Sequence, residues 1–150
     1  MRAEPESVQL NACPLLFDFD GTLAALQLDF AAMRRRVAEL VAAHAPDFPP
    51  LHPGPQPLWT LELIDAVCHH LDGSGAASHF RERALAAIEE VEMAAAATCH
   101  WLPGARETLA LLRSRGHPIA VVTRNCRRAV MAITGGTDWC DGVFTRDEVR

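Results

Sequence analysis

A short apolar run that ends abruptly in two aspartates places the strongest constraint on the fold of this chain. Residues 14–17 (PLLF) are followed directly by residues 18–22 (DFDGT). Because the run is apolar on both faces, it predicts a strand buried in a parallel sheet, and the polar turn marks its carboxyl end. In extended chain the side chains of Asp18 and Asp20 point the same way. The sequence therefore predicts two carboxylates at the sheet edge where open α/β folds bind ligands.

Helical periodicity replaces this pattern in the next seventy or so residues. Apolar residues recur at helical spacing after Asp29, whose side chain is typical of an N-cap. A second helix follows the proline-rich segment 46–57, which we expect to be a loop, and a third spans about residues 78–97. Three helices are too many for one crossover connection, so we expect residues 27–97 to form an inserted helical subdomain.

The last third of the chain alternates helix and strand. Pro103 and Gly104 open a helix that Gly116 ends, and residues 118–122 (PIAVV) form a second strand. Asn125 is expected to cap a short helix, which residues 142–145 (GVFT) follow as a third strand. Strands that alternate with helices indicate a parallel sheet. The predicted fold class is α/β, with a core of residues 1–26 and 98–150 around a helical cap.

Composition excludes several classes of protein. The 150-residue chain has a net charge of −5, which argues against a nucleic-acid partner. No stretch approaches the roughly 20 apolar residues that cross a bilayer, and the polar N-terminus does not resemble a signal peptide. Five cysteines without a Cys-x-x-Cys pair are typical of a reduced compartment. We expect a cytoplasmic protein that binds no membrane; the sequence leaves its oligomeric state open.

Polar residues at the ends of the first two strands carry the chemistry. Asp18 and Asp20 can hold a divalent cation, or one can act as nucleophile and the other as acid and base. Gly21 permits a tight turn after them. Thr123 ends the second strand just before a helix, where a hydroxyl beside free amides suits a phosphoryl oxygen. Since both sites converge on one sheet edge, the sequence predicts phosphoryl transfer.

Several segments resemble one enzyme family. Residues 17–23 (FDFDGTL) are similar to the first motif of the haloacid dehalogenase superfamily in its phosphatase form. Residues 101–106 (WLPGAR) and 121–125 (VVTRN) resemble the approach to its second motif, and residues 144–149 (FTRDEV) the segment before its third. The resemblance runs over residues 14–150 and is strongest to phosphoglycolate-phosphatase-like members. It implies a Rossmann-like core with the inserted helices as a cap.

The resemblance also implies a role for each site residue. Asp18 would attack phosphorus to form an aspartyl-phosphate, and Asp20 would protonate the leaving oxygen and then activate water. Mg²⁺ would be held by the Asp18 carboxylate and the Asp20 main-chain carbonyl. Thr123 would bind the phosphoryl oxygens of a small phosphorylated metabolite. Gly21, Arg124 and Asn125 are further phosphate-binding candidates, with a solvated side chain the alternative for Arg124 and a helix cap the alternative for Asn125.

The chain also departs from the family pattern. The third motif of the family supplies a lysine or arginine and its fourth supplies acidic metal ligands, but this chain has no lysine and stops before both motifs. We therefore expect a truncated chain whose first strand lies at an exposed edge. Two alternatives stay open: a phosphomutase that uses the same aspartates, and an inactive fragment or binding module.

Overall fold

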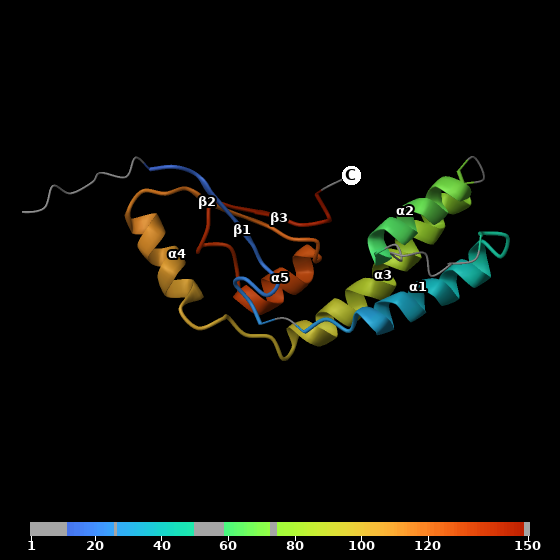
Figure 1. Cartoon of the computed structure of the whole chain (residues 1–150), viewed down its shortest axis with the longest axis horizontal. Coiled ribbons are helices and arrows are strands. Elements are labelled where there is room, and N and C mark those ends of the chain that lie inside the picture. The colour runs from blue at the N-terminus through green and yellow to red at the C-terminus, as the bar shows by residue number, and fades with distance from the viewer. Residues whose placement is uncertain (1–11, 26, 50–58, 73–74, 149–150) are drawn as a thin grey trace, which may run out of the picture.

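Two differently built regions lie end to end along the long axis of the molecule (Figure 1). The computed structural model describes residues 12–25, 27–49, 59–72 and 75–148. In chain order the elements are β1 (Leu15–Asp18), α1 (Phe30–His44), α2 (Thr60–His70), α3 (Ala76–Ala96), α4 (Ala105–Ser114), β2 (Ile119–Val122), α5 (Arg127–Thr134) and β3 (Gly142–Phe144). The strands lie with α4 and α5 in one region, which we call the α/β region, and α1–α3 form the helical region.

The sheet confirms the predicted parallel α/β fold. Its strand order is β1-β2-β3, and both pairings are parallel. Asp18 at the end of β1 pairs with Val122, which in turn pairs with Phe144 at the end of β3. The carboxyl ends of the strands therefore meet along one edge. As expected, β1 lies at the side of the sheet, with β2 as its neighbour.

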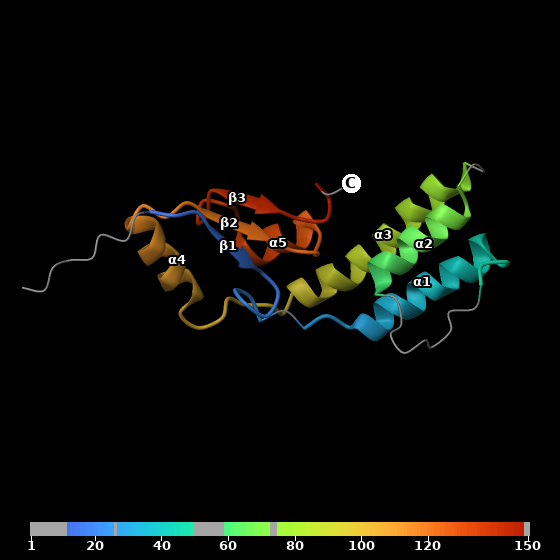
Figure 2. The ribbon, with the colours of Figure 1, turned by 45° about the horizontal axis from the view of Figure 1, so that its top comes forward.

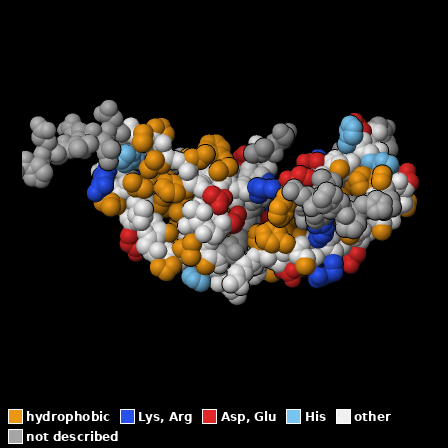
Figure 3. Space-filling model, viewed as in Figure 1, with side chains coloured by type: hydrophobic (Ala, Val, Ile, Leu, Met, Phe, Trp, Pro, Cys, Tyr) orange, Lys and Arg blue, Asp and Glu red, His pale blue; other side chains and the backbone are white. Residues whose placement is uncertain are grey.

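The two faces of the sheet differ sharply. Val121 and Val143 are buried on one face, where Leu109 of α4 and Val130 of α5 pack against them. On the other face Leu16, Val122 and Phe144 are 66%, 40% and 52% exposed. Hydrophobic side chains accordingly gather over the strands on the face seen in Figure 3. The prediction that the first strand is buried on both faces is therefore wrong for one face, because no described helix fills the space above Leu16.

The helical region has a hydrophobic core of its own. Asp29 caps α1 as predicted, since its Oδ1 accepts the amide of Ala32 at 2.8 Å. The helices α1, α2 and α3 bury one continuous cluster between them. Its buried members are Met33, Val37, Val41, Ala45, Leu63, Ile64, Val67, Cys68, Phe80, Ala84, Ile88 and Val91. None of the described helices is long and apolar enough to cross a membrane.

The long helix α3 joins the two regions. Its first turns pack on α1 and α2, and its last turns reach α5 in the α/β region (Figure 2). There Ala96 of α3 packs against Cys126 and Ala129 at the start of α5. Since α3 contributes both to the cluster of the helical region and to this contact with α5, it fixes the position of the helical region relative to the sheet edge.

The prediction that Asn125 caps the fifth helix is wrong. The helix begins at Arg127, and its N-cap is Cys126, whose sulfur accepts the amide of Ala129 at 3.4 Å. Burial raises the pKa of the Cys126 thiol to about 12, so the thiol stays protonated. Asn125 does not cap the helix because its Oδ1, the atom that would accept, takes the adjacent N–H of Cys126 at 2.9 Å, while its amide nitrogen donates to Asp20, more than a hundred residues earlier in the chain.

Candidate active site

Asp20 lies at the centre of a polar cluster at the carboxyl ends of β1 and β2. Its Oδ2 accepts a hydrogen bond from the Thr123 hydroxyl at 2.6 Å, and its Oδ1 accepts one from the Asn125 amide nitrogen at 3.2 Å. The Thr123 hydroxyl in turn accepts the backbone N–H of Asn125 at 3.0 Å. The structure thus brings Asp20, Thr123 and Asn125 together, and Thr123 and Asn125 are both buried.

Asp18 is the more accessible of the two aspartates. Its side chain is exposed, and its Oδ2 accepts one hydrogen bond, from the Thr22 hydroxyl at 3.2 Å. Gly21 has a φ of 78°, a conformation that other residues rarely adopt, so the tight turn after the aspartates requires glycine. The amide of Gly21 does not face a ligand, because it donates to the carbonyl of Ala24 at 2.9 Å.

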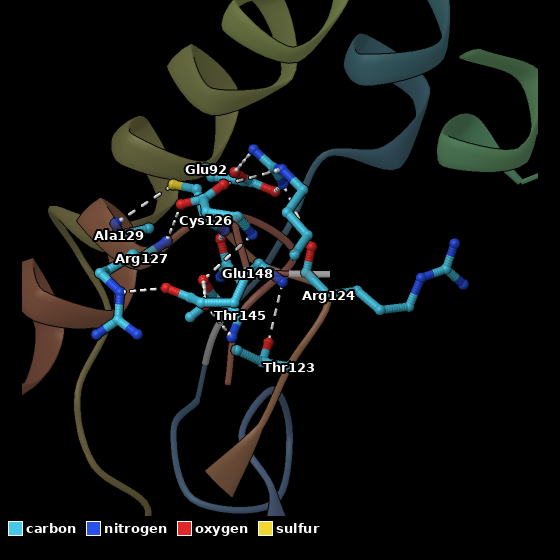
Figure 4. Close-up of polar contacts among 11 residues, drawn as sticks. Glu92, Thr123, Arg124, Cys126, Arg127, Ala129, Thr145 and Glu148 are labelled. Carbon is cyan, nitrogen blue, oxygen red and sulfur yellow. Dashed lines mark hydrogen bonds and ion pairs between the residues drawn. The ribbon is translucent and has the colours of Figure 1, made fainter. Parts of the chain in front are cut away.

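Arg124 is held away from the aspartate cluster. Its Nη2 donates to both carboxylate oxygens of Glu62 on α2, at 2.8 and 2.9 Å. Figure 4 shows this side chain extending away from Thr123 and Glu148. The ion pair links the loop after β2 to the helical region. Arg124 is therefore paired with a carboxylate of the helical region, whereas Thr123 and Asn125 are hydrogen-bonded to the carboxylate of Asp20.

The amino-terminal end of α5 is occupied by side chains of the same chain. The amide of Arg127 donates to Asp147 Oδ2 at 2.8 Å, and the amide of Ala129 donates to Cys126. Glu148 accepts the amide of Thr145 at 2.7 Å, and hydrogen bonds from Thr145 and Arg127 lower the pKa of Glu148 to about 2. The expectation of free amides beside Thr123 is thus wrong for Arg127 and Ala129, because Asp147 and Cys126 accept them.

A cavity of about 260 Å³ opens between the aspartates and the helical region. Polar residues of the sheet edge form one side, and mostly apolar residues of α1–α3 and the segments before them form the other. The residues that line it are Asp18, Asp20, Leu28, Phe30, Met33, Trp59, Thr60, Leu61, Ile88, Glu92, Arg124, Asn125 and Arg146. Both aspartates therefore line one partly open cavity.

Comparison with known families agrees with this arrangement. The model of the family described as haloacid dehalogenase-like hydrolase matches residues 15–146. The chain belongs to this family. The match extends from β1 to the residues just after β3 and includes the aspartate pair. The resemblance drawn from the sequence motifs is thus confirmed at the level of the family.

Solved structures with similar folds have low sequence identity to this chain. One is described as a predicted phosphoglycolate phosphatase from Haemophilus somnus (16% identity, TM-score 0.43, covering 93% of this chain). Another is CbbY from Rhodobacter sphaeroides in complex with phosphate (18% identity, TM-score 0.49, covering 92%). This chain spans 64% of the length of each. No curated protein matches the chain.

The oxygen atoms at the end of β1 fit Mg²⁺, the ion that members of this family generally use. Mg²⁺ prefers hard oxygen ligands and is commonly held by one or two carboxylates, with water and substrate phosphate completing its shell. Asp18 supplies an exposed carboxylate of this kind, whereas both carboxylate oxygens of Asp20 accept hydrogen bonds, so Asp20 would contribute its main-chain carbonyl. Among the described residues no three His, Cys, Asp or Glu side chains gather in a metal-binding group. A magnesium ion here would therefore depend on water and phosphate for its remaining ligands.

One buried ion pair beside the cavity was missed by the sequence patterns. Arg146, just after β3, forms a two-pronged pair with Glu92 of α3, and the side chains are only 9% and 4% exposed. Burial by itself lowers the pKa of Arg146, but the hydrogen bonds and charge of Glu92 outweigh burial and raise it. The spacing of Glu92 from Ile88 could have revealed the pair, since i and i+4 share a helix face. A carboxylate on a buried face requires a cation nearby.

Proposed function

We propose that this chain carries the catalytic aspartates of a Mg²⁺-dependent phosphatase that hydrolyses a small phosphate monoester. The active site would lie between an α/β core of residues 1–26 and 98–150 and a helical cap of residues 27–97. The observation that carries the proposal is the pairing of Asp18 and Asp20 at the carboxyl end of β1, with Asp20 hydrogen-bonded to Thr123 across the sheet edge. Family membership supports it.

Asp18 is the residue suited to attack. Its carboxylate is exposed toward the cavity and accepts one hydrogen bond, so an oxygen lone pair is available for phosphorus. In the proposed first step the bond between phosphorus and the leaving oxygen breaks as the bond to Asp18 forms, which gives an aspartyl-phosphate. In the second step water attacks phosphorus, releases inorganic phosphate and restores the Asp18 carboxylate.

Asp20 is the residue suited to move protons. Thr123 and Asn125 hold its carboxylate in one orientation, as an acid–base group requires. In the proposed mechanism Asp20 gives a proton to the leaving oxygen in the first step and takes one from water in the second. Mg²⁺ bound at Asp18 and the Asp20 carbonyl would neutralise phosphate charge and so lessen its repulsion of the nucleophile.

Phosphate release tests the proposal directly. Asp18→Asn removes the nucleophile and should abolish turnover, and Asp20→Asn should slow it by about 10²–10⁴-fold. Glu90→Gln is a matched control, since it also removes one carboxylate charge but breaks only the exposed Arg36–Glu90 pair, away from the cavity. Mass spectrometry of acid-quenched protein should find phosphate on the peptide that contains Asp18. Undiminished turnover by Asp18→Asn would refute the nucleophile assignment.

Product analysis separates the phosphatase from the alternatives. With a sugar phosphate as substrate, a phosphatase releases inorganic phosphate, whereas a phosphomutase with the same aspartates yields an isomer. An inactive binding module gives neither product and no aspartyl-phosphate. Because the three outcomes differ in the product measured, one incubation with Mg²⁺ distinguishes them.

A further inference from the structure

The cavity that contains the aspartates has an apolar side with unusually exposed aromatic residues. Phe30, the first residue of α1, is 59% exposed, and Trp59, the residue before α2, is 67% exposed. Both line the cavity, together with Met33 and Ile88. Large aromatic side chains that face a cavity without being covered offer apolar surface to whatever occupies the space.

The two cations that line the cavity are already paired. Arg124 is bound through both oxygens of Glu62, and Arg146 is bound through both oxygens of Glu92. Each arginine therefore carries a neutralising carboxylate, and Glu92 itself lines the cavity. Among the described lining residues there is consequently no unpaired cation to receive a second anionic group of a substrate.

We infer that this site selects phosphate monoesters whose leaving group is uncharged and apolar, with an aromatic ring as the best match. The inference rests on the proposed function and concerns the part of the substrate that leaves. A ring fits by volume, since an apolar cavity of about 150 Å³ holds benzene and this one is larger, about 260 Å³. The phosphate would lie at the aspartates and the ring against Phe30 and Trp59.

The same geometry disfavours leaving groups with a carboxylate or a second phosphate. Such a group would enter a cavity that Glu92 lines and whose Arg124 is paired with Glu62, and it would lose water without gaining an unpaired cation. An anion that recruited Arg124 would have to share its charge with Glu62, whose two oxygens already accept from Nη2. Glu62 is thus the specificity-determining residue of the site, because it neutralises the arginine that a second anion would need.

Competition between two small substrates tests the inference. We expect kcat/KM for phenyl phosphate to exceed that for phosphoglycolate by at least about tenfold, which corresponds to 1.4 kcal/mol. Trp59→Ala should raise KM for phenyl phosphate and leave KM for phosphoglycolate nearly unchanged. Glu62→Gln removes the carboxylate that neutralises Arg124. It should raise kcat/KM for phosphoglycolate and so lower the ratio of the two kcat/KM values at least about threefold. Glu90→Gln breaks an ion pair outside the cavity and should leave the preference unchanged.

Binding measurements separate this inference from the proposed function. Calorimetry with phenylphosphonate and phosphonoacetate, which are not hydrolysed, should show the same preference for the ring. Equal or tighter binding of phosphonoacetate, or equal turnover of both substrates, overturns the inference, while Mg²⁺-dependent phosphate release would still uphold the phosphatase. Preferential binding of phenylphosphonate without turnover of either substrate overturns the phosphatase and upholds the apolar subsite.

Discussion

The helical region and the α/β region bury their apolar surface in different ways. In the helical region three helices face one another, so large side chains such as Phe80 and Leu63 are fully buried. In the α/β region the sheet is covered on one face only, and Leu16, Val122 and Phe144 stay exposed on the other. Parallel sheets are normally covered on both faces. The comparison teaches that, within the described residues, the helical region completes its core and the sheet does not.

This difference in burial predicts which substitutions will lower the stability of the chain. A buried aromatic residue in the helical region should be costly to remove, and an aromatic residue on the open sheet face should not. Between the two regions, the buried pair of Arg146 and Glu92 should matter more than exposed ion pairs. Four experiments follow, in order of decreasing effect.

Phe80→Ala should have the largest effect on stability. Phe80 is fully buried among α1, α2 and α3, so truncation removes apolar contacts and leaves a cavity. We expect a loss of about 3–5 kcal/mol in the free energy of unfolding. Urea denaturation followed by circular dichroism measures it. A loss below about 1 kcal/mol would show that the helical cluster is not closely packed and would remove the contrast between the regions.

Arg146→Ala should cause the next largest loss of stability. It leaves the carboxylate of Glu92, only 4% exposed, without its cation, and such losses typically cost about 3–5 kcal/mol. Arg128→Ala is the matched control, since it breaks the exposed pair that Arg128 of α5 forms with Glu89 of the same helix α3 and should cost at most about 1 kcal/mol. Combining Arg146→Met with Glu92→Leu should recover most of the loss. Equal losses in the free energy of unfolding for Arg146→Ala and Arg128→Ala would contradict the conclusion that the Arg146–Glu92 pair is buried.

Glu148 should make the α/β region sensitive to acid. Its folded pKa of about 2 lies below the ordinary value of 4.5, because Thr145 and Arg127 donate hydrogen bonds to the carboxylate. The stabilisation is therefore fully present above pH 4.5 and is lost as the pH falls toward 2. The urea concentration at the midpoint of unfolding should rise with pH between pH 2 and 5, and it should rise less steeply for Glu148→Gln than for the parent chain. An identical slope would mean that Glu148 is not bound to Thr145 in solution.

Phe144→Ala should have the smallest effect. Phe144 is 52% exposed on the open face of the sheet, so we expect a change within about 0.5 kcal/mol in the free energy of unfolding. The measurement is the same urea titration as for Phe80→Ala, which makes the two phenylalanines a direct pair. A loss above about 2 kcal/mol would show that this face is covered in solution.

Local patterns were enough to predict most of the fold. Helical spacing and the side chain of Asp29 gave the start of α1, and the alternation of strands with helices gave the parallel sheet. The run at residues 14–17 gave β1 to within one residue at each end. These features depend on neighbours in the sequence. The exposure of Leu16 does not depend on its neighbours in the sequence. It depends on which element covers that face of the sheet, and an apolar residue in a strand does not reveal whether such an element is present.

The candidate site was predictable in part for the same reason. The aspartates, Thr123 and Asn125 stand at strand ends, so the topology alone predicted that they would meet. Their actual partners were not predictable, because the hydrogen bonds from Thr123 and Asn125 to Asp20 join residues more than a hundred positions apart. Asn125 is lost as a helix cap because its Oδ1 accepts the adjacent N–H of Cys126, while its amide nitrogen donates to Asp20. The roles of these residues in catalysis stay predictions.

The continuous helix α3 has a mechanical consequence. Its 21 residues span about 31 Å, with Glu92 bound to Arg146 near one end and Phe80 inside the helical core near the other. Such a helix acts as a lever whose pivot is the ion pair. The helix from Glu92 back to Ala76 is about 24 Å long, so a tilt of about 5° at the pivot would carry its far end through about 2 Å. The displacement would be smallest beside the pivot, so the part of the cavity that Glu92, Arg146, Phe30 and Trp59 line together would move least.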